Sequence, residues 1–191
     1  MKRCIKRVSF LVLGFLMLTA IFAGCEKTVP NENAVIKIGS FSINLDEYQE
    51  LFDTNAELFK YYEALDLSTK EKLEAFQDYV YTMALKYVIL LYQADKNSVT
   101  LDETEMLDVE KQLEEKLASV GTVTDEARAK MKTQLINDKI TEKYYNKLNS
   151  SATGETANAM IEKWSKELKI EGDKELIRSV LYVEPSATPA T

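Results

Sequence analysis

The chain has 191 residues, with 24 basic and 31 acidic side chains, a formal net charge of −7, two cysteines and no histidine. The absence of histidine excludes Ser-His and Cys-His catalytic arrangements and removes the commonest protein ligand of metal ions. The six glycines are scattered and form no phosphate-binding loop. The excess of acidic side chains argues against binding to nucleic acid, because that binding requires Lys and Arg to neutralise phosphates.

The N-terminus has the pattern of a secretory leader. Four basic residues and no acidic residue lie in Met1–Arg7, and the apolar run Val8–Gly24 carries no charge. A basic start, a short apolar stretch and small residues before a cut are typical of a signal peptide. The run is at the short end of the roughly 17 to 25 residues that span a bilayer as a helix. We therefore predict that residues 1–24 are a cleaved signal peptide.

The apolar run ends on a cysteine, and Phe22-Ala-Gly-Cys25 resembles the bacterial lipoprotein cleavage box. In that box the cysteine thiol receives a diacylglycerol, the chain is cut before the cysteine, and the new amine is acylated in turn. Small residues at Ala23 and Gly24 allow the peptide to enter the processing enzymes, although Phe22 stands where leucine is commoner. We therefore predict that Cys25 carries acyl chains and that residues 25–33 form a lipidated linker.

Three alternatives for this segment are weaker. A buried core helix is disfavoured by the basic cluster at the extreme N-terminus. An uncleaved membrane anchor would leave the domain on the same side of the membrane. A disulfide between Cys4 and Cys25 requires a residue that lies in the cytoplasm or on the discarded peptide. Two or more acyl chains anchor a protein stably, at about 0.8 kcal/mol per buried CH₂, so we expect the protein at the extracytoplasmic face of the cell membrane.

Without residues 1–24, which hold four basic and no acidic side chains, the chain keeps 20 basic against 31 acidic residues and a net charge of −11. The residues that remain after residue 24 are enough for one domain with its own hydrophobic core. We place this domain at residues 34–182 and a disordered tail at residues 183–191. With Cys25 acylated, no thiol remains for a disulfide, for zinc or for nucleophilic chemistry, so we expect no cofactor and no metal.

The domain is predicted to begin with a small β element. Two short β-branched runs, Ala34–Ile38 and Phe41–Ile43, flank Gly39-Ser40, which is typical of a hairpin. Asn44 and Glu47 then have the spacing of a helix capping box. We expect a first helix from Leu45 to about Tyr62.

Apolar residues at steps of three and four predict further helices. The longest opens at the capping box Ser68-Thr-Lys-Glu71, ends near Lys96, and contains the apolar segment Met83–Tyr92, which we expect to be surrounded by other helices. The remaining predicted elements follow in chain order: a helix capped by Thr100 with Glu103 and stopped by Gly121, a helix from Thr124 to about Leu148, a polar loop at Asn149–Asn158, a helix with Ala157, Ile161, Trp164 and Leu168 on one stripe, a short strand at Lys169–Glu171, and a short helix at Asp173–Tyr182.

Three segments together resemble the SurA/PrsA-type extracytoplasmic foldase chaperones. Ala34–Phe52 is similar to the strand, turn, strand and acidic-aromatic helix start that open members of that family. Ala75–Met106 resembles the family's long helix and the capped helix after it, and Trp164–Ile170 resembles its closing helix and returning strand. The resemblance implies a mainly α fold, like the N-terminal helical module of SurA or the related module of trigger factor, with a small β-hairpin.

One departure from the family limits what the resemblance implies. Many members insert a parvulin prolyl isomerase domain between the last two helices, where this chain has only the loop Asn149–Asn158. The parvulin histidines have no counterpart either. We therefore expect no isomerase or other enzymatic activity.

The resemblance implies that the module cradles unfolded or partly folded exported polypeptides. Tyrosine and methionine suit loose recognition of varied chains, and the alternative for each tyrosine is a place at a helix boundary with its hydroxyl in water. For Trp164 we expect a place in the core, and for the acidic helix Asp102–Glu115 a solvated face, with attraction of basic clients the lesser alternative. The candidate peptide-binding residues are Tyr61, Tyr62, Tyr81, Tyr92, Tyr144 and Tyr145.

Two functions of different classes follow. The first is a membrane-anchored, non-catalytic chaperone-like lipoprotein that binds exported polypeptides. The alternative is an interaction or scaffold lipoprotein that holds one folded partner at the cell surface. Neither function involves nucleic acid, and both place the lipid bilayer among the partners through the anchor.

Replacing the predicted lipidation site tests the anchor directly. Cys25→Ala is expected to abolish labelling by a fatty-acid probe and to release or mislocalise the protein, because only a thiol forms the thioether. Metabolic labelling followed by membrane fractionation measures both effects. Persistent labelling of the variant would overturn the assignment.

Overall fold

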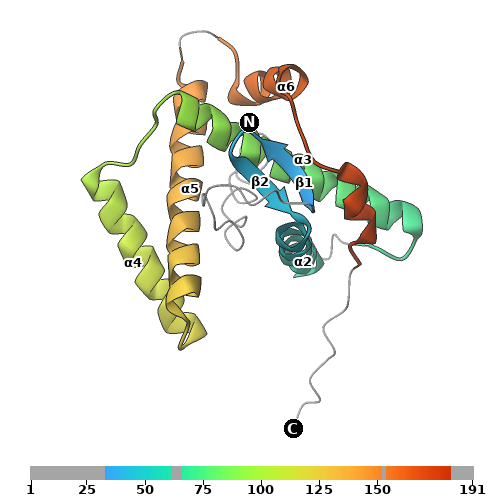
Figure 1. Ribbon diagram of the computed structural model, residues 1–191, viewed down its shortest axis with the longest axis horizontal. Helices are drawn as coiled ribbons and strands as arrows, with labels where there is room; N and C mark the ends of the chain where they lie inside the picture. Colours follow the sequence, from blue (N-terminus) through green and yellow to red (C-terminus); the bar gives the residue numbers. More distant parts are fainter. Residues whose placement is uncertain (1–32, 62–65, 152–153, 182–191) are drawn as a thin grey trace, which may run out of the picture.

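The computed structural model describes residues 33–61, 66–151 and 154–181. The predicted signal peptide, the linker up to residue 32 and the tail at 183–191 lie outside these residues. The described part is mainly helical with a small two-stranded sheet, which confirms the predicted class (Figure 1). Its elements are β1 (Ala34–Ile38), β2 (Phe41–Asn44), α2 (Leu45–Tyr61), α3 (Lys70–Lys96), α4 (Glu103–Val120), α5 (Asp125–Asn149), α6 (Ala157–Glu167) and the 3₁₀-helix η1 (Lys174–Ser179).

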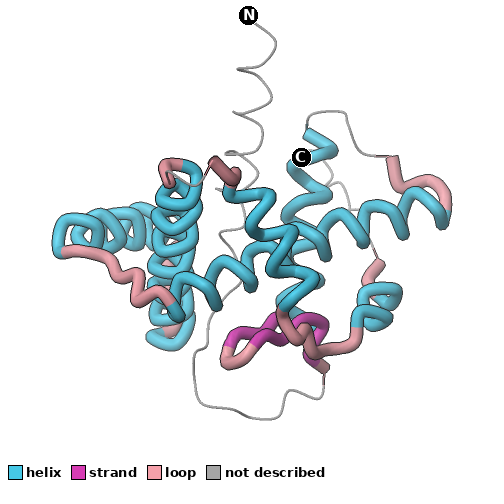
Figure 2. Tube along the Cα trace, turned by 90° about the horizontal axis from the view of Figure 1, so that it is seen from above, coloured by secondary structure: helices cyan, strands magenta, loops and turns pink. Residues whose placement is uncertain are grey.

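The long helix α3 lies at the centre of the fold. The two strands lie on one side of it (Figure 2), and α2, α5, α6 and η1 pack against its other surfaces. In its second half, Tyr87 to Leu91 are buried in succession, as the apolar composition of Met83–Tyr92, which holds one charged residue, predicts. The buried residues of that half are Ala84, Tyr87, Val88, Ile89, Leu90, Leu91 and Ala94.

The predicted hairpin is confirmed. β1 and β2 pair antiparallel, with Ile36 opposite Ile43 and Ile38 opposite Phe41. Gly39 turns the chain with a φ of +62°, a conformation that favours glycine. A Cβ at Gly39 would lie 2.9 Å from Cε2 of Tyr92 on α3, so the turn also needs glycine in order to approach the helix.

The C-terminal segment returns to the outer edge of β1. The main chains of Lys37 and Glu171 exchange two hydrogen bonds, of 2.7 and 2.8 Å, and the N–H of Asp173 donates to the carbonyl of Ala34 at 2.9 Å. Between them, Gly172 has a φ of +112°, and a Cβ there would lie 2.7 Å from the carbonyl oxygen of Val35. The strand predicted at Lys169–Glu171 is therefore present only as this single bridge.

Helix α2 begins at the predicted capping box. The side chain of Asn44 accepts from the N–H of Glu47 at 2.9 Å, and the N–H of Asn44 donates to the Glu47 carboxylate at 2.8 Å. Tyr48 follows one residue later and is fully buried. Its hydroxyl donates to the main-chain carbonyl of Gln77 on α3, which satisfies its polar end and joins the two helices.

Helix α3 begins one residue later than its motif predicts, so the prediction of Ser68 with Glu71 as its capping box is wrong. Thr69 is the N-cap, and its hydroxyl accepts from the N–H of Lys72. The N–H of Ser68 donates to the carboxylate of Asp66 at 3.0 Å, which holds Ser68 in the preceding turn.

The predicted cap of α4, Thr100 with Glu103, is wrong by two residues. Asp102 is the N-cap: its carboxylate accepts from the N–H of Glu105 at 2.9 Å, and its own N–H donates to the Glu105 side chain at 2.8 Å. The sequence fits the motif in both positions, and a carboxylate interacts more favourably with the positive end of a helix. Lys143 of α5 reinforces this choice, because its ammonium group donates to both Glu105 and the carbonyl of Thr100.

The other predicted helix ends are close to the observed ones. Thr124 is the N-cap of α5, and Gly121, with a φ of +78°, ends α4. The loop predicted at Asn149–Asn158 is shorter than expected, since α5 includes Asn149 and α6 begins at Ala157. The helix predicted at Asp173–Tyr182 is a 3₁₀-helix that ends at Ser179, and Tyr182 lies outside the described residues.

Arg178 of η1 holds the C-terminal segment against α3. Its guanidinium donates to both carboxylate oxygens of Asp78, at 3.0 and 2.9 Å. It also donates to the main-chain carbonyl of Glu74 and to the side-chain oxygen of Gln77, both at 3.1 Å. Lys174 adds an ion pair to Asp78 at 2.8 Å, and the two cations together hold the pKa of the Asp78 carboxyl below its usual range.

The observed cap of α4 leads to a stability prediction. Asp102→Ala removes the side-chain acceptor at the helix start and is expected to lower the stability of α4 by about 1 kcal/mol. Thr100→Ala is the matched control and is expected to have a much smaller effect, because only the main chain of Thr100 makes a hydrogen bond. Amide hydrogen exchange along α4 measures both variants, and a larger loss of protection in Thr100→Ala would contradict the observed cap.

Candidate functional site

Helices α4 and α5 form a helical hairpin, which we call the arm (Figure 1). Within the described chain, α4 packs mainly against α5, whereas α5 also packs against α3 and α6. The arm has a small core of its own, in which Val109, Leu113 and Leu135 are buried. The remainder of the protein is built on a separate and larger core around α3. The arm is thus joined to the body chiefly through the C-terminal half of α5.

Ion pairs join the two helices of the arm. Glu105 pairs with Lys143 at 2.6 Å, and Asp108, Glu110 and Glu114 pair with cations that lie successively nearer the N-terminus of α5. Exposed pairs of this kind contribute little individually, but all four align acidic α4 with basic groups of α5. Part of the predicted solvated acidic face, Asp102–Glu115, is therefore neutralised within the molecule. The cationic partners are Lys143, Lys139, Lys132 and Arg128.

The predicted tyrosine candidates do not share one surface. Tyr61, at the end of α2, is 80% exposed, and Tyr62 lies outside the described residues. Tyr81 is partly buried against the main core, with the ammonium group of Lys174 at 5.0 Å from its ring centre. Of these three residues, Tyr61 is the one the structure places at an open surface.

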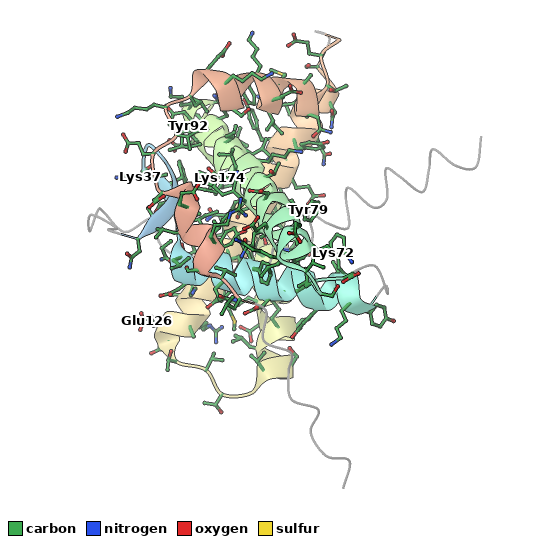
Figure 3. All side chains as sticks on the ribbon, turned by 90° about the vertical axis from the view of Figure 1, so that its right-hand side faces the viewer. Lys37, Lys72, Tyr79, Tyr92, Glu126 and Lys174 are labelled. Carbon is green, nitrogen blue, oxygen red and sulfur yellow. The ribbon has the colours of Figure 1, made fainter. Side chains whose placement is uncertain are left out.

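Tyr92 lies at the other end of α3. Its ring contacts the hairpin turn at Gly39 and has the ammonium group of Lys96 at 4.6 Å from its centre. Figure 3 shows Tyr92 and Glu126, near the start of α5, toward opposite ends of the molecule. Tyr92 is therefore separated from the free end of the arm.

Tyr144 belongs to the core, which corrects its prediction as a contact residue. Its side chain is 4% exposed, and its hydroxyl accepts a hydrogen bond from Asn97 at 3.0 Å. Its ring stacks on Trp164 of α6, with 6.3 Å between centroids and 11° between planes. Trp164 itself is partly buried against the main core, as its predicted role in the core requires. Tyr145 is also partly buried there.

Sequence reasoning missed an aromatic cluster between α2 and α3, formed by Phe52, Phe59, Phe76 and Tyr79. Ring centroids of Phe59 lie 5.6 Å from Phe76 and 5.4 Å from Tyr79, both edge to face. Phe52 and Phe76 are buried, whereas Phe59 is partly exposed and Tyr79 is 43% exposed. Tyr79 is seen at the surface near Lys72 in Figure 3. The cluster thus extends from the main core to the surface.

The arm carries two further exposed apolar side chains that the sequence analysis did not single out. Leu107 is 65% exposed and Val120 is 56% exposed. Leu107 is two residues from buried Val109, which places it off the stripe that faces α5. Val120 lies on the stripe but at the free end of α4, where α5 does not cover it. The helical period of α4 alone therefore predicts that Leu107 is exposed.

One carboxyl group has a strongly altered affinity for protons. Asp138 of α5 accepts a hydrogen bond from the hydroxyl of Tyr87 at 3.1 Å through Oδ1. Its Oδ2 is buried and has no hydrogen-bond partner within the described structure. Burial raises the pKa of Asp138 to about 7. A carboxyl in this state is a functional candidate, but its buried oxygen is closed to a substrate.

Two further observations bear on chemistry and location. No group of Cys, Asp or Glu side chains in the described segments has the arrangement of a metal site. None of the described helices combines the length and apolar composition that crossing a bilayer requires. Cys25, the predicted lipidation site, lies outside the described residues, so the structure bears on the domain and not on its anchor.

Comparison with known proteins gives no relative. The sequence matches no family model and no curated protein, and the structure matches no solved structure. The resemblance to the SurA/PrsA-type chaperones therefore rests on the residue pattern of the three segments alone.

The contrasting positions of two tyrosines can be tested by substitution. Tyr144→Ala is expected to cost about 3 to 5 kcal/mol of stability, because it removes a buried ring and its stacking on Trp164. Tyr61→Ala is expected to stay within about 0.5 kcal/mol of the unsubstituted chain, because the side chain is exposed. Chemical denaturation measures both, and equal losses would contradict the assignment of one residue to the core and the other to the surface.

Proposed function

We propose that this chain is a lipid-anchored, non-catalytic chaperone-like protein that binds unfolded or partly folded exported polypeptides at the extracytoplasmic face of the membrane. The sequence supports the location through its leader and Cys25. The polypeptide-binding role is supported by the resemblance to the foldase chaperones and, above all, by one observation. Exposed apolar side chains lie at several separate places on an acidic body, among them the aromatic cluster and the arm.

The distribution of these side chains favours a flexible client. A stable complex with one folded partner buries about 800 Å² on each side in a continuous area. Tyr79 on α3 and Leu107 and Val120 on α4 are instead isolated exposed side chains. An extended chain can reach several such contacts at once, and weak separate contacts release it again.

The acidic charge fits the same role. With a net charge of −11 beyond residue 24, the protein repels copies of itself and stays soluble while apolar side chains remain exposed. A client segment that carries both apolar and basic residues fits a body of this net charge best.

The anchor confines this activity to the place where it is needed. Acyl chains on Cys25 would hold the domain on a short linker next to the membrane from which exported chains emerge. Tethering raises the effective concentration of a weak binder toward those chains without any new contact.

The test is suppression of aggregation. A chain that starts at Glu26 keeps every core residue of the described structure, from Ala34 to Val180. At stoichiometric amounts it is expected to reduce light scattering by several unrelated, chemically unfolded proteins. No effect on any of them would contradict the proposal, and an effect confined to one folded partner, detected by direct binding, would favour the scaffold alternative.

The arm is tested with a matched pair of variants. Replacing Leu107 and Val120 together by serine is expected to weaken suppression several-fold while circular dichroism stays unchanged, because both side chains are exposed. Lys111→Ser on the same helix is the control, since this residue is exposed and makes only an ion pair with Glu115. Equal suppression by the two variants would remove the arm from the proposed binding surface.

A further inference from the structure

The arm and the body meet along α5, and Asp138 lies where one core gives way to the other. On the N-terminal side of Asp138, Leu135 and Ile136 belong to the core of the arm. On its C-terminal side, Ile140 and Tyr144 belong to the main core. Asp138 itself is hydrogen-bonded to Tyr87 of the central helix α3. This one carboxyl group thus occupies the junction between two separately packed parts.

The junction is unsuited to a negative charge. Oδ2 of Asp138 is buried with no hydrogen-bond partner in the described structure, and Oδ1 has only the Tyr87 hydroxyl. A buried carboxylate needs several donors or a close cation to offset its loss of hydration. The neutral acid has a much smaller hydration loss, so the closed junction favours the protonated form.

The charged groups around Asp138 come from three helices. Tyr87 of α3 donates its hydroxyl and Lys116 of α4 attracts the carboxylate, and both favour ionisation, whereas Glu142 of α5 opposes it. Lys139, the next residue, is paired with Asp108 of α4. None of the groups acting on Asp138 within the described chain lies on α6. Burial outweighs the attraction of Lys116, which is why the pKa of Asp138 is raised to about 7.

We propose that Asp138 is a proton-dependent contact that joins the arm to the body, closed when its carboxyl is protonated and opened when the carboxyl loses its proton. Opening exposes Oδ2 to water, and the hydration that the carboxylate gains offsets the loss of the hydrogen bond from Tyr87 as α5 loosens from α3. The arm then changes its position relative to α2 and the hairpin. The surface that carries Leu107 and Val120 moves with it.

The direction of the pH dependence follows from linkage. The folded chain holds the Asp138 proton up to about pH 7, whereas the unfolded chain releases it near the ordinary pKa of 3.8. The stabilisation from this proton is therefore present in acid, is lost as the pH rises toward 7, and stays absent above it. Between pH 6 and pH 8 the ratio of ionised to protonated Asp138 changes about 100-fold.

The position of the arm can be measured across this range. The chain from Glu26 contains no cysteine, so Glu57→Cys on α2 and Ser119→Cys on α4 introduce two unique sites for spin labels at exposed positions. The distance distribution between the labels is expected to change with a midpoint near pH 7. A distribution that is the same at pH 6 and pH 8 would overturn the proposal.

Two substitutions identify the responsible group. Asp138→Asn cannot ionise and is expected to keep the acidic distance distribution at every pH. Asp125→Asn, at an exposed position of the same helix, is expected to behave like the unsubstituted chain. An unchanged pH response in Asp138→Asn, or loss of the response in Asp125→Asn, would contradict the assignment to Asp138.

Tyr87→Phe provides an independent variant in case Asp138→Asn fails to fold. The substitution keeps the ring but removes a hydrogen bond to Oδ1 that only the closed form makes. Opening is therefore easier, and the midpoint of the distance change is expected to move to lower pH. A midpoint that stays in place or moves to higher pH would overturn the proposed role of the Tyr87–Asp138 contact.

Discussion

Burial of the second half of α3 is the constraint on which the remaining structure depends. From Tyr87 to Leu91 five successive side chains are buried, so this stretch of the helix has no side that faces water. Full burial of one large apolar side chain contributes about 1.5 to 3 kcal/mol, and the chain obtains it only by covering every side of α3 at once. The hairpin, α2, α5, α6 and η1 do so together. The two glycines at Gly39 and Gly172 are part of this constraint, because each lets main chain approach where a side chain would collide.

The arm is built on a different principle. Its core has few buried residues, and ion pairs along its length set the orientation of α4 on α5. Regions with few buried apolar contacts open at lower free energy than the main core. A small, charged and partly independent arm beside a rigid body provides apolar contact surface that can shift without cost to the centre of the fold. The proposed binding of varied polypeptides and the proposed control of the arm by a proton both depend on this difference.

Local rules account for most of what the sequence predicted correctly. Asn44 with Glu47, the turn at Gly39 and the apolar period of α3 are patterns within a few residues of each other, and all three are found in the structure. At α4 the same rule is satisfied twice, and a contact from Lys143 on a distant helix helps to decide between the two positions. The altered state of Asp138 depends entirely on the packing of α3, α4 and α5. The apolar period of α5 does distinguish Tyr144 from Tyr145, because Tyr144 lies four residues from both Ile140 and Leu148. The stacking of Tyr144 on Trp164, in contrast, arises only when α6 packs against α5.

The bridge between Lys37 and Glu171 joins the first strand of the domain to one of its last described segments. Pairing over so long a sequence separation is slow, since the intervening loop must close first. A chain that crosses a membrane from its N-terminus onward would present β1 outside long before Glu171 and Arg178 follow. The outer edge of the hairpin would then have no neighbour until translocation is nearly complete. On the proposed export route, the domain would therefore complete its fold only once the C-terminal segment has crossed, and would stay an incompletely folded, export-compatible polypeptide until that moment.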